Sequence, residues 1–325
     1  MTQRMTRPKL TLQPIQPGEI GQATAMATVW NAACGADWMI SPQFAASATR
    51  PPANGYQAGR LAVADGEPLG FVLASTRTAP PDGPAWGWLD GLAVTPAAQG
   101  QGIGRLLADW AEGWLAEQGC RTVQVGGGSR SLVTGLPTEL ESQPFFARRG
   151  YAKTPTEAEV WDMAANLAGY TPPADLPAIP GQVRPAHPGD AAALLDFVRR
   201  AFPDSWYPEV AEFLADGGRP SDFMLLWTER GVDGFCQLTF LDSRRPLNRF
   251  YPFRLPQPWG HLGPVGVSAD RRGQGFGLAL VDAGLRRLHN NGVNGCIIHG
   301  VSRPASLARF DFTPHRPYAR LQKSL

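Results

Sequence analysis

Two short glycine-rich segments have residue types and spacing that could bind a phosphate. They read Gln99-Gly100-Gln101-Gly102-Ile103-Gly104 and Arg272-Gly273-Gln274-Gly275-Phe276-Gly277, and each follows an apolar run and precedes apolar residues at helical spacing. Glycine adopts positive φ and has no Cβ, so the backbone can lie close to a ligand. The N–H groups of a helix's first turn lack intrahelical partners, and the helix dipole adds partial positive charge there. Each segment therefore predicts a binding site for a phosphate or pyrophosphate.

Two other glycine patterns do not fit these segments. Neither segment contains the Lys-Ser/Thr pair of the nucleotide-triphosphate loop. The G-x-G-x-x-G spacing also fails, because Gly104 is followed by Arg105, Leu106 and Leu107, and this disfavours the dinucleotide-binding fold. A strand-to-helix turn can contain glycine for conformational reasons alone. Two copies, 173 residues apart and in the same context, make that interpretation much weaker.

The pattern Gln/Arg-x-x-Gly-x-Gly after a strand resembles the acyl-coenzyme A motif of the GNAT N-acetyltransferase superfamily. The resemblance covers nearly the whole chain and implies an α/β fold (α+β, mixed sheet) with two tandem acyl-CoA N-acyltransferase domains. It also implies acetyl-CoA as cosubstrate and no metal. The turn amides would cradle the pyrophosphate, and the preceding strand would pair with the pantetheine arm. The implied cofactor-binding residues are Leu92, Val94, Gln99, Gly100, Gln101, Gly102, Ile103, Gly104, Val265, Val267, Arg272, Gly273, Gln274, Gly275, Phe276 and Gly277.

A second internal repeat indicates where each half begins. The segments 13–19 and 184–190 both end in Pro-Gly-acid, are 171 residues apart, and precede a helical pattern. Between the halves, residues 164–181 are rich in proline and predict a stiff connector. We therefore expect an N-terminal domain over residues 1–172 and a C-terminal domain over residues 173–325.

The remaining pattern predicts the elements that position the two turns. Apolar runs on either side of Asp65-Gly66 predict a β-hairpin, and residues 223–240 repeat the pattern. Strands are expected over Trp86–Val94 and His261–Val267, directly before the turns. A strand over Glu159–Met163, a short helix over Ala305–Phe312 and a last strand over Tyr318–Leu321 complete the expected order.

If acetyl-CoA is bound, an amine would attack its thioester directly, which needs a base and an oxyanion donor, and often an acid for the thiolate. Asp90 and His261 are the candidate bases, because each lies in or beside a cofactor strand. A turn acid and a polar strand end remain alternative interpretations of the two. The family's usual acid is a tyrosine four residues before a helix-ending glycine, whereas this chain has Phe146 and Leu307 at the aligned positions.

Charge and cysteine content narrow the class of protein. The net charge of +2 over 325 residues argues against a dedicated nucleic-acid binder. The four cysteines form no C-x-x-C pair, no apolar run reaches 18 residues, and Met1–Leu10 lacks the apolar core of a signal peptide. We expect a cytoplasmic monomer or homodimer without a nucleic-acid or membrane partner.

These patterns together favour an N-acetyltransferase that moves an acetyl group from acetyl-CoA to a primary amine of a small molecule. Arg271 and Arg272 make the second turn more basic than the first, which slightly favours the second half as the catalytic one. The missing tyrosines leave an alternative, an acyl-CoA-binding sensor or structural module with one or both halves inactive. A protein-modifying acetyltransferase is a third possibility.

Overall fold

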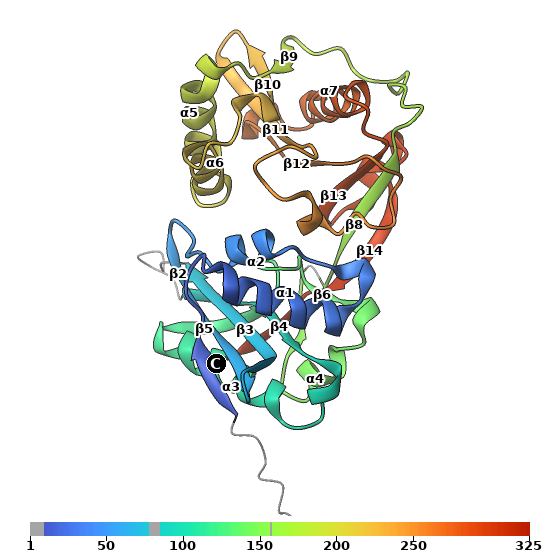
Figure 1. Cartoon of the computed structure of the whole chain (residues 1–325). Helices are drawn as coiled ribbons and strands as arrows, with labels where there is room; N and C mark the ends of the chain where they lie inside the picture. Colours follow the sequence, from blue (N-terminus) through green and yellow to red (C-terminus); the bar gives the residue numbers. More distant parts are fainter. Residues whose placement is uncertain (1–9, 78–84, 157) are drawn as a thin grey trace, which may run out of the picture. The chain divides into compact units, whose positions relative to one another are not determined.

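The computed structural model describes residues 10–77, 85–156 and 158–325 (Figure 1). The chain forms two compact units, Met1–Val160 with Tyr318–Leu325, and Trp161–Pro317. The signal-peptide expectation concerns Met1–Leu10 and so falls almost entirely outside the described residues. No helix within the described ranges has the length and apolarity needed to cross a bilayer.

Within the described residues, the first unit contains a seven-stranded sheet in the order β1-β2-β3-β4-β5-β15-β7. Its strands are β1 (Thr11–Pro14), β2 (Gly55–Ala64), β3 (Glu67–Arg77), β4 (Ala85–Val94), β5 (Cys120–Val125), β7 (Ala152–Lys153) and β15 (Leu321–Ser324). Its helices are α1 (Ile20–Cys34), α2 (Pro42–Ala48), α3 (Ile103–Glu117) and α4 (Gln143–Ala147). Asp65 and Gly66 both have positive φ between β2 and β3, which confirms the predicted hairpin.

The core of the first unit explains why α3 forms where it does. Ile103, Leu107, Ala111 and Leu115 recur at three- and four-residue intervals and are all buried. They pack with apolar side chains of the central strands, Val72, Leu89 and Val123. This packing fixes the start of α3 directly beyond the carboxyl end of β4, where the first glycine turn lies.

The second unit repeats the arrangement around an eight-stranded sheet, again counting described residues only, in the order β6-β14-β8-β13-β12-β11-β10-β9. Its strands are β6 (Leu136–Pro137), whose residues belong to the first unit, and β8 (Glu159–Asn166), β9 (Gln182–Pro185), β10 (Phe223–Thr228), β11 (Gly231–Thr239), β12 (Trp259–Val267), β13 (Gly295–Val301) and β14 (Thr313–Ala319). The helices are α5 (Ala191–Ala201), α6 (Trp206–Ala215) and α7 (Phe276–Asn290). The short helix expected over Ala305–Phe312 is a 3₁₀ helix, η8 (Pro304–Phe310).

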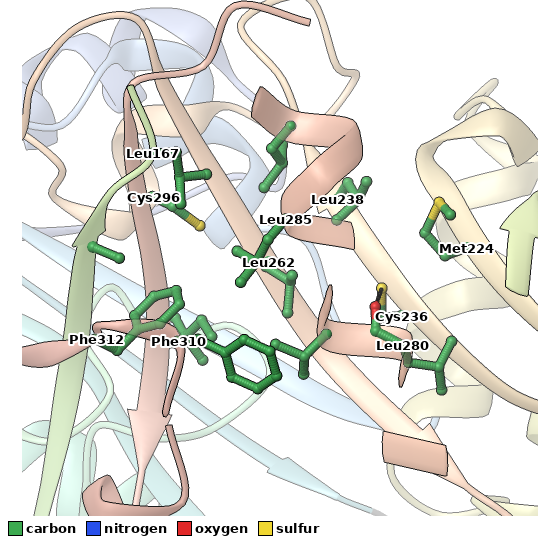
Figure 2. Close-up of a cluster of buried hydrophobic side chains, with 14 of the residues drawn as sticks. Leu167, Met224, Cys236, Leu238, Leu262, Leu280, Leu285, Cys296, Phe310 and Phe312 are labelled. Atoms are coloured by element: carbon green, nitrogen blue, oxygen red, sulfur yellow. Dashed lines mark hydrogen bonds between the residues drawn. The ribbon is translucent and has the colours of Figure 1, made fainter. Parts of the chain in front are cut away.

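A dense apolar core joins α7 to the second sheet. Leu280 and Leu285 of α7 pack with Cys236 and Leu262 of the sheet, and Figure 2 shows Phe310 and Phe312 in the same cluster. Asp311, between these two phenylalanines, has φ of 58°, whereas the corresponding Gly150 in the first half has φ of 86°. The two halves therefore share a left-handed turn here although only one uses glycine.

Two strands of the first half, β6 and β8, belong to the second sheet, and one strand of the second half, β15, belongs to the first sheet. The strand predicted over Glu159–Met163 is present as β8 but pairs with β13, with Met163 opposite Ile298. The expected last strand divides at Arg320 into β14 and β15, and β15 pairs with β5 and β7 of the first sheet. β8 and β15 thus each pair with a sheet formed mainly by the other half of the chain. There they hydrogen-bond to backbone N–H and C=O groups of the neighbouring strands. The expected domain boundary between residues 172 and 173 therefore stays a prediction. It divides the two sequence repeats, whereas no single boundary in the sequence divides the two compact units.

The exchange predicts that a substitution near the C-terminus destabilises the first unit. Leu321 is 2% exposed in the core around α3, so Leu321→Ala should lower the free energy of unfolding of that unit by about 2–4 kcal/mol. Hydrogen exchange should show faster amide exchange in β4 and β5. The control Leu325→Ala, at a side chain that is 41% exposed, should change little. Loss of protection confined to β12 and β13 would contradict the exchange.

Candidate active site

The first glycine turn presents the start of α3 without a side-chain cap. Gly100 and Gly102 have φ of 75° and 87°, and Gly102 is the residue before the helix. No side chain among the described residues caps it. The Gln99 amide donates to the Val94 carbonyl at 3.0 Å, which closes the turn from within. The first-turn N–H groups therefore point outward without an intrahelical acceptor.

The second turn has nearly the same backbone. Gly273 and Gly275 have φ of 75° and 88°, and α7 begins directly after Gly275. The Gln274 amide donates to the Asp270 carbonyl at 2.8 Å, as the Gln101 amide does to Ala97 at 3.0 Å in the first turn. The sequence repeat thus extends to backbone angles and to the hydrogen bonds that shape the turn.

A cavity of about 1320 Å³ extends from the first turn into the first unit. The parallel strands β4 and β5 pair as far as Leu89 and Val125 and then part, and the cavity reaches into this fork. Its lining includes backbone and side chains of the predicted cofactor-binding set, namely Leu92, Val94, Gln99, Gly100, Gly102 and Gly104. Because β4 still pairs with β3 along this stretch, only its β5-side edge faces the cavity.

A charged network forms one wall of this cavity. Arg149 contacts Asp109 at 2.7 Å and Glu112 at 3.0 Å, and Lys323 of the exchanged strand contacts Glu112 at 2.6 Å. Burial acts to raise the pKa of Glu112, but the hydrogen bonds from Arg149 and Lys323 outweigh it and lower the pKa. The last strand of the chain therefore supplies a cation to the wall of the first cavity.

The two positions where the family has an acid contain apolar side chains in the structure as well. Phe146 is buried and lies edge-on between Phe145 and Tyr151, with ring centroids 5.2 and 5.4 Å away. Leu307 lies on η8 and packs against the second core. The nearby hydroxyl of Tyr151 donates to Glu112 at 3.1 Å. Neither aligned position can protonate a thiolate.

The proline-rich connector lies against the second turn. A Cβ at Gly275 would be 2.4 Å from Cγ of Pro177, and Leu176 and Ile179 of the connector pack on the core beneath α7. The expected basic advantage of this turn is partly neutralised, because Arg271 contacts Glu229 at 2.7 Å. Arg272 is exposed.

Asp90 is buried on the face of β4 away from α3. Its neighbours Leu89 and Gly91 line the cavity, whereas the Asp90 carboxylate accepts a hydrogen bond from Ser131 at 2.7 Å. Its second oxygen has no hydrogen-bond partner in the described part of the chain. Burial raises the pKa of Asp90 to about 6, against the opposing effect of hydrogen bonds from Ser75 and Ser131.

His261 is also fully buried and pairs with a second histidine that sequence reasoning missed. Nε2 of His261 lies 2.7 Å from Nδ1 of His299 on β13, and the ring of Phe250 stacks on His261 at 3.6 Å. Burial lowers the pKa of both histidines, that of His299 to about 3. The only sequence signal for His299 is a polar residue before Gly300 at the end of an apolar strand.

No group of three His, Cys, Asp or Glu residues within the described ranges could hold a metal ion. The predicted site residues divide into two sets, one in each unit. The first set combines a glycine turn, a cavity and Asp90. The second combines a glycine turn, the connector and the histidine pair.

The model of the acetyltransferase (GNAT) family matches residues 24–151 and 191–308. Mycothiol acetyltransferase of Actinosynnema mirum is 32% identical over 205 residues, which are 62% of this chain and 62% of that relative. The match thus spans about three fifths of that relative's length. Mycothiol acetyltransferase of Nocardia farcinica is 28% identical over 74% of this chain and 72% of its own.

Two solved structures share the fold. The GCN5-related glucosamine N-acetyltransferase region of a fungal multi-domain GH3 β-N-acetylglucosaminidase aligns with a TM-score of 0.80 at 23% identity, over 98% of this chain and 38% of that chain. A tandem GNAT protein from the clavulanic acid biosynthesis pathway aligns with a TM-score of 0.68 at 17% identity, over 97% and 98% of the two chains. At these identities the likeness shows the fold alone.

The contact between Pro177 and the second turn can be tested with matched alanine substitutions. Gly102→Ala and Gly275→Ala introduce Cβ atoms at almost equal φ, so the conformational cost is about 1–2 kcal/mol for each. Only the second Cβ meets other residues, Pro177 and Ile179, within 4 Å. Gly275→Ala should therefore speed hydrogen exchange of residues 176–183 and destabilise its unit more than Gly102→Ala destabilises the first. Equal effects would argue against the contact.

The buried carboxyl group of Asp90 predicts a pH-dependent difference in stability. Because its pKa is raised to about 6 from about 3.9 in the unfolded chain, the wild-type free energy of unfolding should fall as pH rises from about 4 to about 6. Asp90→Asn removes the titrating carboxyl group and, with it, this pH dependence of the free energy of unfolding. The variant should gain stability relative to wild type, from nothing below pH 4 to on the order of 2 kcal/mol above pH 6. A pH-independent difference in denaturant titrations would contradict the raised pKa.

Proposed function

The chain belongs to the GNAT family of acetyltransferases, and from this premise we propose that it transfers an acetyl group from acetyl-CoA to a primary amine of a small molecule. The observation that carries the proposal is the duplicated glycine turn, with positive φ values that agree to within a few degrees. Two uncapped helix starts with the same backbone are suited to the same anionic group. The pyrophosphate of acetyl-CoA is such a group.

The first cavity supports acetyl-CoA as the ligand of the first turn. Its volume of about 1320 Å³ exceeds the roughly 300–1,000 Å³ of ordinary small-molecule sites, so an extended molecule fits. Beyond Leu89, the open edge of β4 offers backbone donors and acceptors to the amides of the pantetheine arm. The thioester would then lie in the fork between β4 and β5.

The reaction would be direct attack of the neutral amine on the thioester carbonyl. The C–N bond forms and the C–S bond breaks, so the neutral amine nitrogen loses one proton, which ends on the thiol. With phenylalanine and leucine at the two aligned acid positions, water or another group would protonate the thiolate. A base is therefore the part that the chain must supply, and Asp90 and His261 are the candidates.

The acceptor is proposed from the relatives. Both are named mycothiol acetyltransferase, so we propose an acceptor of the kind that those enzymes acetylate. The net charge of +2 and the free thiols Cys120, Cys236 and Cys296 fit a cytoplasmic protein that acts as a monomer or homodimer without nucleic acid or membrane.

A second function, acyl-CoA binding without catalysis, is favoured by two observations. The tyrosine is missing from both aligned positions, and the connector contacts the second turn at Pro177. In that case the protein would be an acyl-CoA-binding sensor or structural module, with one or both halves catalytically inactive. The two functions differ in whether any amine causes release of the thiol.

Matched leucine substitutions test which turn binds acetyl-CoA. Gly104 and Gly277 lie in the first turns of α3 and α7 without positive φ, and a Cβ at either has room. Gly104→Leu should fill the first cavity and weaken the binding of acetyl-CoA at the first turn at least tenfold in calorimetric titration. Gly277→Leu should leave the affinity of this first site unchanged. Thiol release by wild type with a panel of primary amines, checked by mass spectrometry of the product, separates transfer from binding alone. No binding of acetyl-CoA by wild type would reject both functions.

A further inference from the structure

The two histidines of the second unit meet where its central strands part. β12 and β13 run parallel and pair up to His261 and Ile297, and the pairing stops there. Two residues on, β13 has a bulge against β8 between Ile298 and Val301, with Gly300 at φ of 70°. Bulges redirect side chains, and this one accompanies a His299 side chain that reaches His261. The pair therefore lies at the fork that corresponds to the cavity-lined fork of the first unit.

The ring of Phe250 holds the pair in place. It lies parallel to His261, with an interplanar angle of 3° and ring centroids 3.6 Å apart, and its centroid is 5.0 Å from His299. Phe250 belongs to a 3₁₀ helix, η6 (Leu247–Phe250), which packs with Leu247 on Ile297. His261 is 0% exposed, and its Nδ1 has no partner among the described residues. Buried polar atoms are rarely left without a hydrogen-bond partner, so the unpaired Nδ1 indicates a role for this pair beyond stabilising the fold.

Burial and nearby cations both favour the neutral form of the two rings. Burial is the main cause that lowers the pKa of each ring, and the guanidinium groups of Arg245 and Arg249 add to it. From β8, Asp162 accepts a hydrogen bond from the Gly300 N–H at 3.2 Å, and from β11 the uncharged Thr239 lies opposite His261. The same two cations disfavour an ammonium ion nearby. An acceptor at this place would therefore be present as the nucleophilic neutral amine.

We propose that His261 and His299 form a neutral proton-accepting pair in the second half. In this pair His299 contacts the acceptor amine, and His261 positions the ring of His299. The proposal rests on the proposed function and deepens it, because it names the half that transfers the acetyl group. His299 is the partly exposed member, whereas His261 is fully buried. In the productive tautomer, Nδ1–H of His299 donates to Nε2 of His261, which leaves the lone pair of His299 Nε2 free.

Proton movement then follows the bond changes of the reaction. As the amine nitrogen bonds to the thioester carbon, its N–H bond breaks and the proton passes to Nε2 of His299. The positive charge is shared across the 2.7 Å hydrogen bond to His261. When the C–S bond breaks, the thiolate takes up one proton. This proton comes from His299, either directly or by exchange through solvent, so the histidine pair returns to neutrality. No oxidant, reductant or metal is required.

Steady-state kinetics with acetyl-CoA and a reactive primary amine tests the pair. His299→Ala should lower kcat by about 10²–10⁴-fold with an unchanged KM for acetyl-CoA, and added imidazole should restore part of the rate. His299→Asn retains a hydrogen-bond partner for His261 and serves as the variant more certain to fold, with the same expected loss. His261→Gln should also lower kcat without changing KM, but imidazole should not rescue it, because the position is closed. His187→Asn, at an exposed histidine that caps a turn, is the matched control and should retain full activity.

Two further measurements separate a chemical role from a structural one. Arg249→Gln should move the acid limb of the kcat/KM profile to higher pH, because removing the cation raises the pKa of the histidines. Nitrogen NMR of labelled histidine should show both rings neutral down to below pH 5. Wild-type rates in both His299 variants, or a His299 that titrates near pH 6.5, would overturn the pair alone. Failure of the wild type to acetylate any amine would instead overturn the proposed function, and the role of the pair with it.

Discussion

Incomplete pairing of two parallel strands is the constraint on which the rest of the structure depends. In each unit a central strand, β4 or β12, pairs along its length with an antiparallel neighbour but only part of the way with its parallel one. Buried backbone groups beyond the fork must find other partners. In the first unit, Gly126 and Leu132 supply two of them by donating to Leu89 and Asp90. The remaining edge faces a cavity, so the same gap in the sheet forms the surface that we propose binds acetyl-CoA.

The two forks have similar backbone pairing, but different side chains lie at each. At the first, a buried carboxyl group is bonded to Ser131 and does not line the cavity. At the second, two neutral imidazoles lie under an aromatic ring, near arginines rather than serines. A cavity lies beside the first turn, whereas Pro177 lies against the second. The two halves share the turn geometry that we propose binds a phosphate, whereas the side chains that we propose as bases differ between them.

Local features of the fold could be predicted from the sequence, and long-range ones could not. The hairpin at Asp65-Gly66 and both glycine turns depend on residues within a few positions, and their φ values follow from residue type. The exchange of β8 and β15 could not be predicted, because a strand's alternation does not say which sheet it joins. His299 was missed for a similar reason: its partner is 38 residues away, and only the bulge at Gly300 brings the two rings together. Asp90 was found as a candidate, but its burial and its bond to Ser131, 41 residues on, were not foreseen.

The exchanged strand has a consequence for how the protein is made. β15 lies in the first sheet between β5 and β7, yet it follows the whole second half in the sequence. During synthesis, β5 and β7 leave the ribosome long before the strand that pairs between them. The first unit must therefore wait, with those two edges open, until the second half and β15 have been synthesised. Exposed edges of this kind attract other chains, so the order of synthesis makes the N-terminal half, rather than the later one, the part that chaperones need to protect.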